Sequence, residues 1–271
     1  MSDVILAVLG RPETASHVLK AAEQLCALAG QATLIALAID APQHLDPLVA
    51  EALIAEAQIA DELREREQTR LAALASAFDA WAAAPPPGIS AQWRKVFGTA
   101  DDIVEEAGRR ADFIVIAQPT AQDDPQTRAG FRAALLRSWR PVLVVPSGAP
   151  ASFGRIVAVA WREDGRASKA LIPALRLLSG AAEFHVLQGI RGGPQALPVP
   201  AAVSDHGIAA RMHVLAIQGV FGQVLLDKAH ALGADLLVMG AYAHTPLREM
   251  IFGGVTRFML DHADLPVLMR H

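Results

Sequence analysis

The chain has 271 residues, 52% of them hydrophobic, and a formal net charge of −4. This length suits one large core or two ordinary ones, and two domains are the better expectation. A chain with a net negative charge does not attract a polyanion, so nucleic acid is not an expected partner. Charges also interrupt every apolar run before the roughly 18 residues that a membrane span needs, so no membrane association is expected.

The start of the chain and its cysteine favour a cytoplasmic protein. The first residues place an acid before a short apolar run and lack the basic opening and cleavage site of a secretory signal. Cys26 follows Leu19 and Ala22 at helical spacing, which is typical of a core residue in a reduced protein.

Apolar runs of strand length alternate with helical patterns through the first half of the chain. We expect strands at residues 4–8, 32–39, 91–97, 111–116 and 140–145. Between the second and third of these, residues 45–81 carry apolar side chains at three- and four-residue spacing, which predicts a long amphipathic helix.

The second half repeats this order, with strands expected at residues 155–160, 183–187, 212–217, 234–239 and 265–269. With Ile5 aligned on Ile156, the second half is shorter by about 28 residues in its middle, where a Gly/Pro-rich loop at 189–200 replaces most of the long helix. Buried strands alternating with helices predict an α/β fold of two Rossmann-like or flavodoxin-like domains, 1–146 and 153–271. Each would hold a five-stranded, mostly parallel sheet with helices on both faces, and residues 147–152 would link them.

One segment of the second half has the sequence pattern of an anion-binding site. An apolar run ends at Gly240, a polar loop follows, and a helix of small residues begins at 253–256. The first amides of a helix have no partner within it, so an anion can bind there. The candidate binding residues of this segment are Met239, Gly240, Ala243, His244, Arg248, Gly253, Gly254, Val255 and Thr256.

These residues, within ADLLVMGAYAHTPLREMIFGGVTRFML and the LPVL that follows, resemble the universal stress protein family. Its nucleotide-binding members carry Gly, two residues, Gly, nine residues, then Gly followed by Ser or Thr. On this chain the pattern falls on Gly240, Ala243, Gly253 and Gly254. Ala243 therefore replaces a glycine, and Gly254 replaces a residue with a hydroxyl group.

A second departure concerns the nucleoside. Members that bind ATP hold it with an acid after the first strand of the domain. In the second half, the position of that acid corresponds to Trp161 or Arg162. Asp164 comes two residues after this position. We include Trp161 and Arg162 among the candidate binding residues.

The resemblance implies two tandem domains of the adenine nucleotide alpha hydrolase-like type, whose fifth strands pair across a pseudo-twofold axis. It further implies a cytoplasmic role in stress response, with ATP or AMP and Mg in domain 2, and the chain could also form a homodimer. No nucleotide is expected in domain 1, because residues 117–125 lack a glycine or a basic residue and carry acids that would repel phosphate. That loop is either kept for packing or suited to a different, cationic ligand.

The sequence favours binding over catalysis. No Gly-Lys-Ser/Thr closes a glycine-rich loop and no Gly-x-Ser-x-Gly is present, so at most slow ATP hydrolysis is expected and no catalytic residue is assigned. The histidines lack the spacing of a zinc site, and no metal ligand is assigned. Three hypotheses remain: a nucleotide-binding stress protein acting through partners, a nucleotide-free tandem scaffold for protein interactions, and a binder of small molecules or lipids near Trp81 and Trp93.

Overall fold

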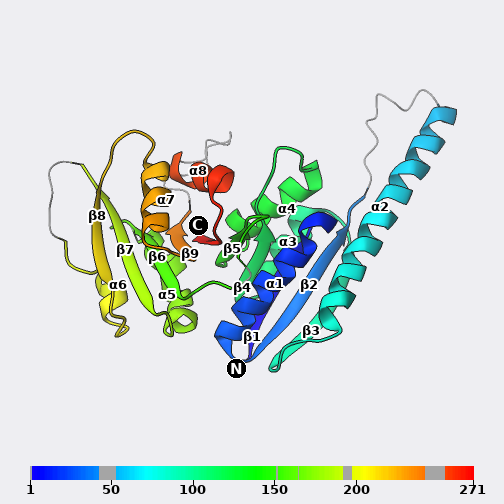
Figure 1. Cartoon of the computed structure of the whole chain (residues 1–271). Coiled ribbons are helices and arrows are strands. Elements are labelled where there is room, and N and C mark those ends of the chain that lie inside the picture. The colour runs from blue at the N-terminus through cyan, green and yellow to red at the C-terminus, as the bar shows by residue number, and fades with distance from the viewer. Residues whose placement is uncertain (1, 43–52, 151, 164, 192–196, 242–253) are drawn as a thin grey trace.

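The structure is a computed structural model that describes residues 2–42, 53–150, 152–163, 165–191, 197–241 and 254–271 (Figure 1). The first half contains five strands and four helices in alternation. They are β1 (Asp3–Leu9), α1 (Pro12–Ala29), β2 (Ala32–Asp40), α2 (Leu53–Ala82), β3 (Ile89–Phe97), α3 (Ala100–Arg109), β4 (Phe113–Ala117), α4 (Pro125–Leu136) and β5 (Val142–Val145).

The second half repeats the order with shorter elements. They are β6 (Ile156–Trp161), α5 (Arg166–Leu178), β7 (Glu183–Ile190), α6 (Ala201–Ser204), β8 (Arg211–Ala216), α7 (Phe221–Ala231), β9 (Leu236–Gly240), α8 (Gly254–His262) and β10 (Val267–Arg270). All ten expected strands are present within a few residues of their predicted bounds. The α/β expectation is confirmed.

The strands form one continuous sheet in the order β3-β2-β1-β4-β5-β10-β9-β6-β7-β8. The halves therefore have the same internal order, and neighbouring strands within each half are parallel. Only β5 and β10 pair antiparallel, with Leu143 opposite Leu268. This is the pairing of fifth strands that the resemblance implies, and it joins the two halves edge to edge.

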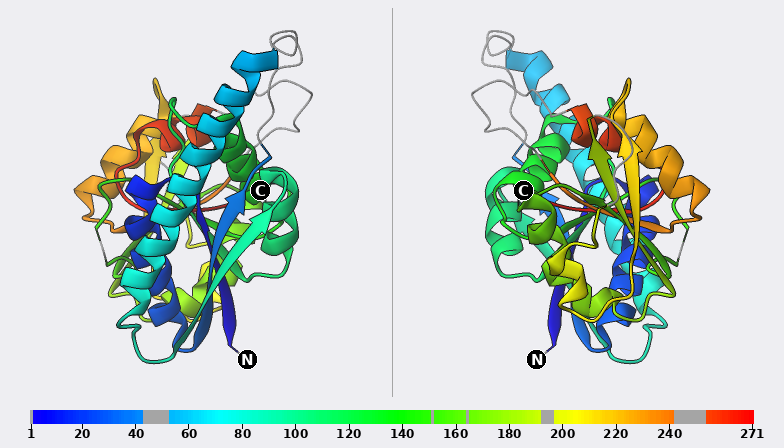
Figure 2. Two further views of the ribbon diagram at one scale, coloured as in Figure 1. Left: turned by 90° about the vertical axis from the view of Figure 1, so that its right-hand side faces the viewer. Right: turned by 90° about the vertical axis from the view of Figure 1, so that its left-hand side faces the viewer.

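Helices cover both faces of the sheet (Figure 2). Neighbouring residues of a strand face opposite sides, so Phe113 lies in a core with side chains of α1, α2 and α5, whereas Ile114 lies in a core with side chains of α3, α4, α7 and α8. Cys26 of α1 is 1% exposed in the first core. Burial, followed by the negative charges of Glu23 and Asp3, raises the pKa of Cys26 to about 12, which confirms it as an unreactive core residue.

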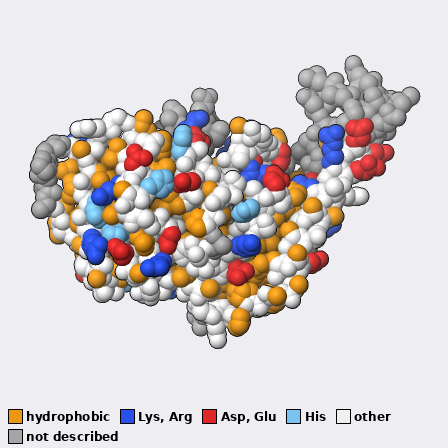
Figure 3. Space-filling view, in the orientation of Figure 1, with side chains coloured by type: hydrophobic (Ala, Val, Ile, Leu, Met, Phe, Trp, Pro, Cys, Tyr) orange, Lys and Arg blue, Asp and Glu red, His pale blue; other side chains and the backbone are white. Residues whose placement is uncertain are grey.

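The long helix α2 has 30 residues, and its C-terminal part packs into the core. Leu71, Leu74 and Phe78 are buried there, while the N-terminal turns reach beyond the sheet (Figures 1 and 2). On the face drawn in Figure 3, acidic and basic side chains are interspersed along this helix. In the second half the corresponding place holds the four-residue helix α6, in keeping with the shorter middle of that repeat.

An aspartate fixes the same junction in both halves. Asp112 donates its N–H to the carbonyl of Val4 at 2.8 Å, and its carboxylate accepts from Val4 N at 2.9 Å. Asp235 and Ile156 repeat both bonds, at 2.9 and 3.2 Å. Ile156 is therefore the counterpart of Val4, one residue away from the alignment on Ile5 that the apolar runs suggest.

Candidate functional site

The segment expected to bind an anion in the second half begins at the end of β9. Met239 is 3% exposed, and Gly240 is the last residue of the strand. The next residue, Ala241, donates its N–H to the carbonyl of Arg270 at 2.8 Å. The candidates that lie outside the described residues are Ala243, His244, Arg248 and Gly253.

Beyond that gap, α8 begins at Gly254, so the structure has the expected order of strand, intervening segment and helix. Gly254 is exposed, and a Cβ added to it would meet no atom within 4 Å. Val255 is half-buried, and Thr256 is buried at 4% exposure. Of the candidates described at this helix start, Gly254 is therefore the one open to an anion from solvent.

The residues after β6 are arranged differently from what the family pattern implies. Trp161 is buried, and its indole Nε1 donates to Glu163 Oε1 at 2.8 Å. Arg162 is exposed, and Asp164 lies outside the described residues. The sequence analysis passed over Glu163, an exposed acid at this strand end.

An aromatic ring covers the end of β7 in the second half. A Cβ at Gly189 would lie 2.3 Å from Cζ of Phe221, the first residue of α7. The absence of a side chain at residue 189 is what lets this ring lie against the strand. Phe221 therefore occupies space near the carboxyl edge of the sheet.

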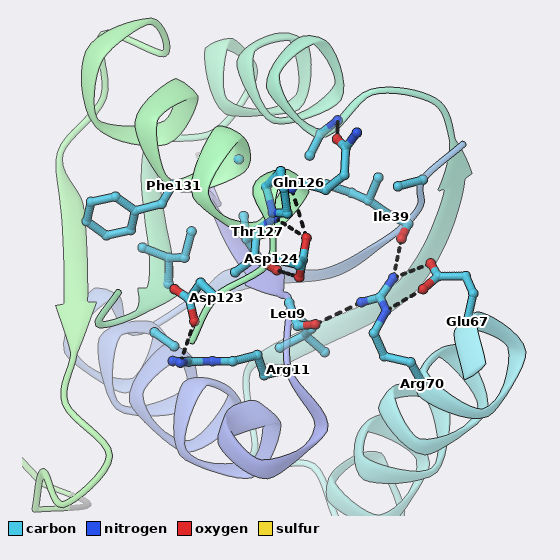
Figure 4. A pocket seen from close by; sticks show the side chains of 18 of the residues that line it. Leu9, Arg11, Ile39, Glu67, Arg70, Asp123, Asp124, Gln126, Thr127 and Phe131 are labelled. Atoms are coloured by element: carbon cyan, nitrogen blue, oxygen red, sulfur yellow. Dashed lines mark hydrogen bonds and ion pairs between the residues drawn. The ribbon is translucent and has the colours of Figure 1, made fainter. Parts of the chain in front are cut away.

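The first half has a cavity of about 410 Å³ at its own carboxyl edge (Figure 4). The ends of β1, β2 and β4 form its base, where Leu9, Ile39 and Ile116 contribute apolar side chains. The starts of α3 and α4 and one side of α2 complete the wall. Open parallel sheets bind ligands at this edge, which makes the cavity a candidate binding site.

Arg70 links α2, one wall of this cavity, to the strand ends at its base. Its Nη1 donates to the carbonyl of Gly10 at 2.8 Å and its Nη2 to the carbonyl of Ile39 at 2.6 Å. Glu67 accepts from Nε and Nη2 at 2.8 and 2.6 Å. Burial alone would lower the pKa of Arg70, but the bonds and charge of Glu67 raise it above its ordinary value. This guanidinium is a fixed, neutralised part of the wall.

Arg11 holds the opposite side of the cavity (Figure 4). Its Nη1 lies 2.7 Å from Asp123 Oδ1 and 3.0 Å from Thr120 Oγ1, and its Nη2 donates to the carbonyl of Gln118 at 2.9 Å. The side chain of Asp123 is only 2% exposed, so the ion pair is largely buried. Asp123 of the 117–125 loop thus pairs with a basic residue that follows β1, which favours the packing interpretation of that loop.

Asp124 caps α4. Its Oδ1 accepts from the N–H groups of Gln126 and Thr127 at 2.8 and 2.9 Å, and its Oδ2 accepts from Thr127 Oγ1 at 2.6 Å. Burial would raise the pKa of Asp124, but the hydroxyl and amide bonds lower it below its usual value. A carboxylate of the chain itself therefore occupies the helix start where a phosphate would bind.

The sequence analysis missed this cavity because its polar residues come from distant segments. Glu67 and Arg70 read as part of a charged helix face, and residues 117–125 read as a loop without a base. One local signal was present. Asp124 followed by Pro125 is a helix-start signature, since Asp caps well and Pro is favoured at the first helical position.

The apolar ground near Trp81 and Trp93 is packed on itself. Phe78 lies between the two indoles, with ring centroids 5.9 and 5.6 Å away, and Trp81 Nε1 donates to Glu23 Oε2 at 2.6 Å. A groove of about 650 Å³ runs beside this cluster, lined by both charged and apolar side chains from α2 and β3. The aromatic rings of the protein itself therefore fill part of the site that the small-molecule or lipid hypothesis places near Trp81 and Trp93.

Two further features bear on function. Within the described residues, no group of three or more His, Cys, Asp or Glu side chains is arranged to hold a metal ion. No helix in the same part of the chain is long and apolar enough to cross a bilayer.

Comparison with known proteins identifies a family for the C-terminal part of the chain. Residues 156–271 match the model of the universal stress protein family. No curated protein matches the chain. Among solved structures, a universal stress protein from Archaeoglobus fulgidus DSM 4304 aligns over 100% of this chain and 96% of its own, with a TM-score of 0.65 and 17% identity.

Two Pseudomonas aeruginosa structures are similar to a comparable degree. A functionally unknown protein from strain PAO1 covers 99% of this chain and 92% of its own, with a TM-score of 0.60 and 18% identity. A protein from strain UCBPP-PA14 that is named after the same family covers 99% and 93%, with a TM-score of 0.61 and 19% identity. At these identities the likeness concerns the fold. Residues 156–271 therefore form a universal stress protein domain, and the chain carries the same fold twice in tandem.

Proposed function

We propose that this stress-response protein binds ATP or AMP, with Mg, through its C-terminal half and acts in the cytoplasm through protein partners rather than by turnover. Its family supports the stress-response role. The bound nucleotide would be a signal that changes which partners the protein meets.

The observation that carries the proposal is the open start of α8. Gly254 is exposed, and a Cβ added to it would meet no atom of the described residues within 4 Å, which supports the approach of an anion to this helix start. The corresponding helix of the first half, α4, has its first amides bonded to Asp124. We therefore take the two halves to differ at the place where the family pattern puts phosphate.

The nucleoside would lie between the ends of β6 and β9. Trp161 is buried at the end of β6, and Glu163 offers a carboxylate two residues later. Glu163 could accept hydrogen bonds from ribose hydroxyls or from the adenine amine. Hydrolysis would be slow at most, because the sequence contains no P-loop lysine to stabilise charge on the phosphates.

A second candidate is a nucleotide-free scaffold. It is favoured by the β5–β10 pairing, which makes one rigid ten-stranded sheet and leaves two helical layers for contacts. The departures at Ala243 and Gly254 are compatible with this alternative.

Calorimetric titration of the full chain with ATP and AMP in the presence of Mg separates the two candidates. We expect one nucleotide per chain. Gly254→Ser restores the hydroxyl of the family pattern and should tighten ATP binding about tenfold, as one charge-assisted hydrogen bond would. Gly254→Asp adds a carboxylate at the first residue of α8, where it would repel phosphate, and should weaken binding by tenfold or more.

Gly254→Ala is the matched control, since it adds a methyl group in open space without a charge or a hydroxyl group. Its affinity should stay within about threefold of the original. Absence of ATP and AMP binding by the unmodified chain would overturn the nucleotide proposal in favour of the scaffold. Equal affinities for all three variants would place the nucleotide away from α8.

A further inference from the structure

We propose that the cavity of the N-terminal half is a binding site for an uncharged, mainly apolar small molecule. This site is separate from the nucleotide site proposed for the C-terminal half, and neither proposal depends on the other. Three features support it: the size of the cavity, the ion pairs of Arg11 and Arg70 in its wall, and the contrast between the two halves.

The cavity has the size and the walls of a ligand pocket. Its volume of about 410 Å³ lies within the range of about 300–1,000 Å³ that small-molecule sites occupy. Large apolar side chains come from five elements that surround it, β1, β2, α2, β4 and α4, so a ligand would gain burial on several sides. The apolar lining residues include Val8, Leu9, Ile39, Leu63, Ile116 and Phe131.

Two of the three arginines in the wall, Arg11 and Arg70, are paired with carboxylates, and the third, Arg66, is exposed. Three arginines and three carboxylates line the cavity. Arg11 is bonded to Asp123 and Arg70 to Glu67, and both guanidinium groups also donate to main-chain carbonyls. Most N–H groups of Arg11 and Arg70 are therefore used within the protein, although Nε of Arg11 has no hydrogen-bond partner among the described residues, so these two side chains are poorly placed to clamp a phosphate or carboxylate. An uncharged molecule enters such a wall without breaking an ion pair.

The route toward α4 is closed to an anion. Asp124 occupies the first amides of that helix, and its negative charge would repel a second anion. The end of β1 also lies close to α4, because a Cβ at Gly10 would be 3.3 Å from Thr127 Cγ2. The start of α4 itself lines the cavity, so a phosphate there would meet the carboxylate of Asp124 instead of free amides.

The C-terminal half shows how this fold fills the same region. There Phe221, the first residue of α7, lies on Gly189 of β7. The register of the strand pairs makes Ile39 the counterpart of Gly189, and Ala100 is the first residue of α3 as Phe221 is of α7. The N-terminal half thus has a methyl group where its repeat has a ring, and Gly130 of α4 keeps the adjoining wall small.

The uncharged fluorescent compound N-phenyl-1-naphthylamine tests the proposal on the unmodified full chain. Fluorescence titration should show saturable binding of one molecule per chain. In amide NMR spectra of the same complex, the signals of Gly10 and Gly130, which line the cavity, should shift. ATP with Mg should not displace the compound. Absence of saturable binding, shifts confined to other regions, or displacement by ATP would each overturn the proposal.

Two variants fill the cavity in different ways. Ala100→Phe combined with Ile39→Gly copies the arrangement of Phe221 on Gly189, and Ala117→Leu extends a side chain from the end of β4. Each should weaken binding of the compound at least tenfold and leave the calorimetric response to ATP unchanged. Ala121→Leu, at an exposed position of the neighbouring loop, is the matched control and should bind as the original does. Unchanged binding by a filled variant with a native circular dichroism spectrum would place the compound elsewhere.

Discussion

Arg176 of α5 and Asp3 of β1 form a two-point ion pair across the two halves of the chain. Nη1 lies 2.5 Å from Oδ2 and Nη2 lies 2.6 Å from Oδ1. Asp3 is buried at 8% exposure, and the guanidinium also lies 5.9 Å from the ring centroid of Phe113 in β4. The hydrogen bonds and charge of Asp3 raise the pKa of Arg176 above its ordinary value.

Arg176→Ala should lower the free energy of unfolding by about 1–3 kcal/mol, because it leaves the buried carboxylate of Asp3 without its charged partner. Arg176→Lys should cost less, since it keeps the charge but loses the fork that meets both carboxylate oxygens. Urea denaturation of Arg176→Ala, Asp3→Ala and the double variant measures the coupling. Strictly additive losses would show that the pair contributes no energy between the halves.

Asp124→Ala should destabilise the chain by about 0.5–2 kcal/mol, because α4 loses the carboxylate that caps its first amides. The pKa of Asp124 is lowered in the folded state, so its stabilising effect is complete above the unfolded value of about 4 and is lost as pH falls through the folded pKa. Urea denaturation at pH 7 and pH 3 should therefore show a smaller difference between variant and original at pH 3. An equal difference at both values would contradict the role of the charge.

His213→Gln should reduce the loss of stability on acidification. Burial, then the charges of Lys228, His185 and Arg211, lower the pKa of His213, whose Nε2 lies 3.1 Å from Nδ1 of His185. As pH falls below about 6.5, the unfolded chain takes up the proton first, so stability is lost from there down to the folded pKa.

Thermal unfolding of the original and the His213→Gln variant at pH 7.5 and pH 5.5 measures this effect. Glu183, whose Oε2 lies 3.3 Å from His185 Nε2, is present in both proteins, so its charge contributes equally to each measurement. His206→Gln at an exposed position is the control and should leave the pH dependence unchanged. An identical profile for His213→Gln and the original would refute the assignment.

Gly189→Ala should cost about 1–3 kcal/mol, because its Cβ would lie 2.3 Å from Cζ of Phe221 and the ring must move. Phe221→Ala in the same chain should remove most of that extra cost. Denaturation of both single variants and the double variant checks this expectation. Gly180→Ala, which meets no atom within 4 Å, serves as the control. Additive effects at Gly189 and Phe221 would mean that the ring does not lie on the strand.

The pattern of apolar residues predicted the layers well, and the charged residues were harder to interpret. Leu71, Leu74 and Phe78 were expected on the apolar face of a helix, and all three are buried. Arg70 stands among them in sequence and was passed over, although it bonds to the ends of β1 and β2. The spacing of apolar residues along a helix indicates which face is buried. It does not indicate which atoms a long polar side chain can reach.

The alignment of the two halves that the sequence suggested also differs by one residue from the alignment in the structure. Apolar runs align Ile5 with Ile156, because both lie in continuous hydrophobic strands that match equally well when shifted. The paired bonds of Asp112 and Asp235 fix the alignment on Val4 instead. Register in a strand buried on both faces is set by its neighbours, since its own sequence has no alternation to fix it.

The sequence by itself determined the α/β class, the duplication, the ten strands and the core position of Cys26, because these follow from hydrophobic period and composition over short windows. Only the tertiary structure decided that the two sheets are one, that Asp124 closes the start of α4, and that a cavity lies between α2, α4 and the ends of β1, β2 and β4. These features join residues that are far apart in the chain. Their meeting depends on strand order and helix placement, which no local pattern encodes.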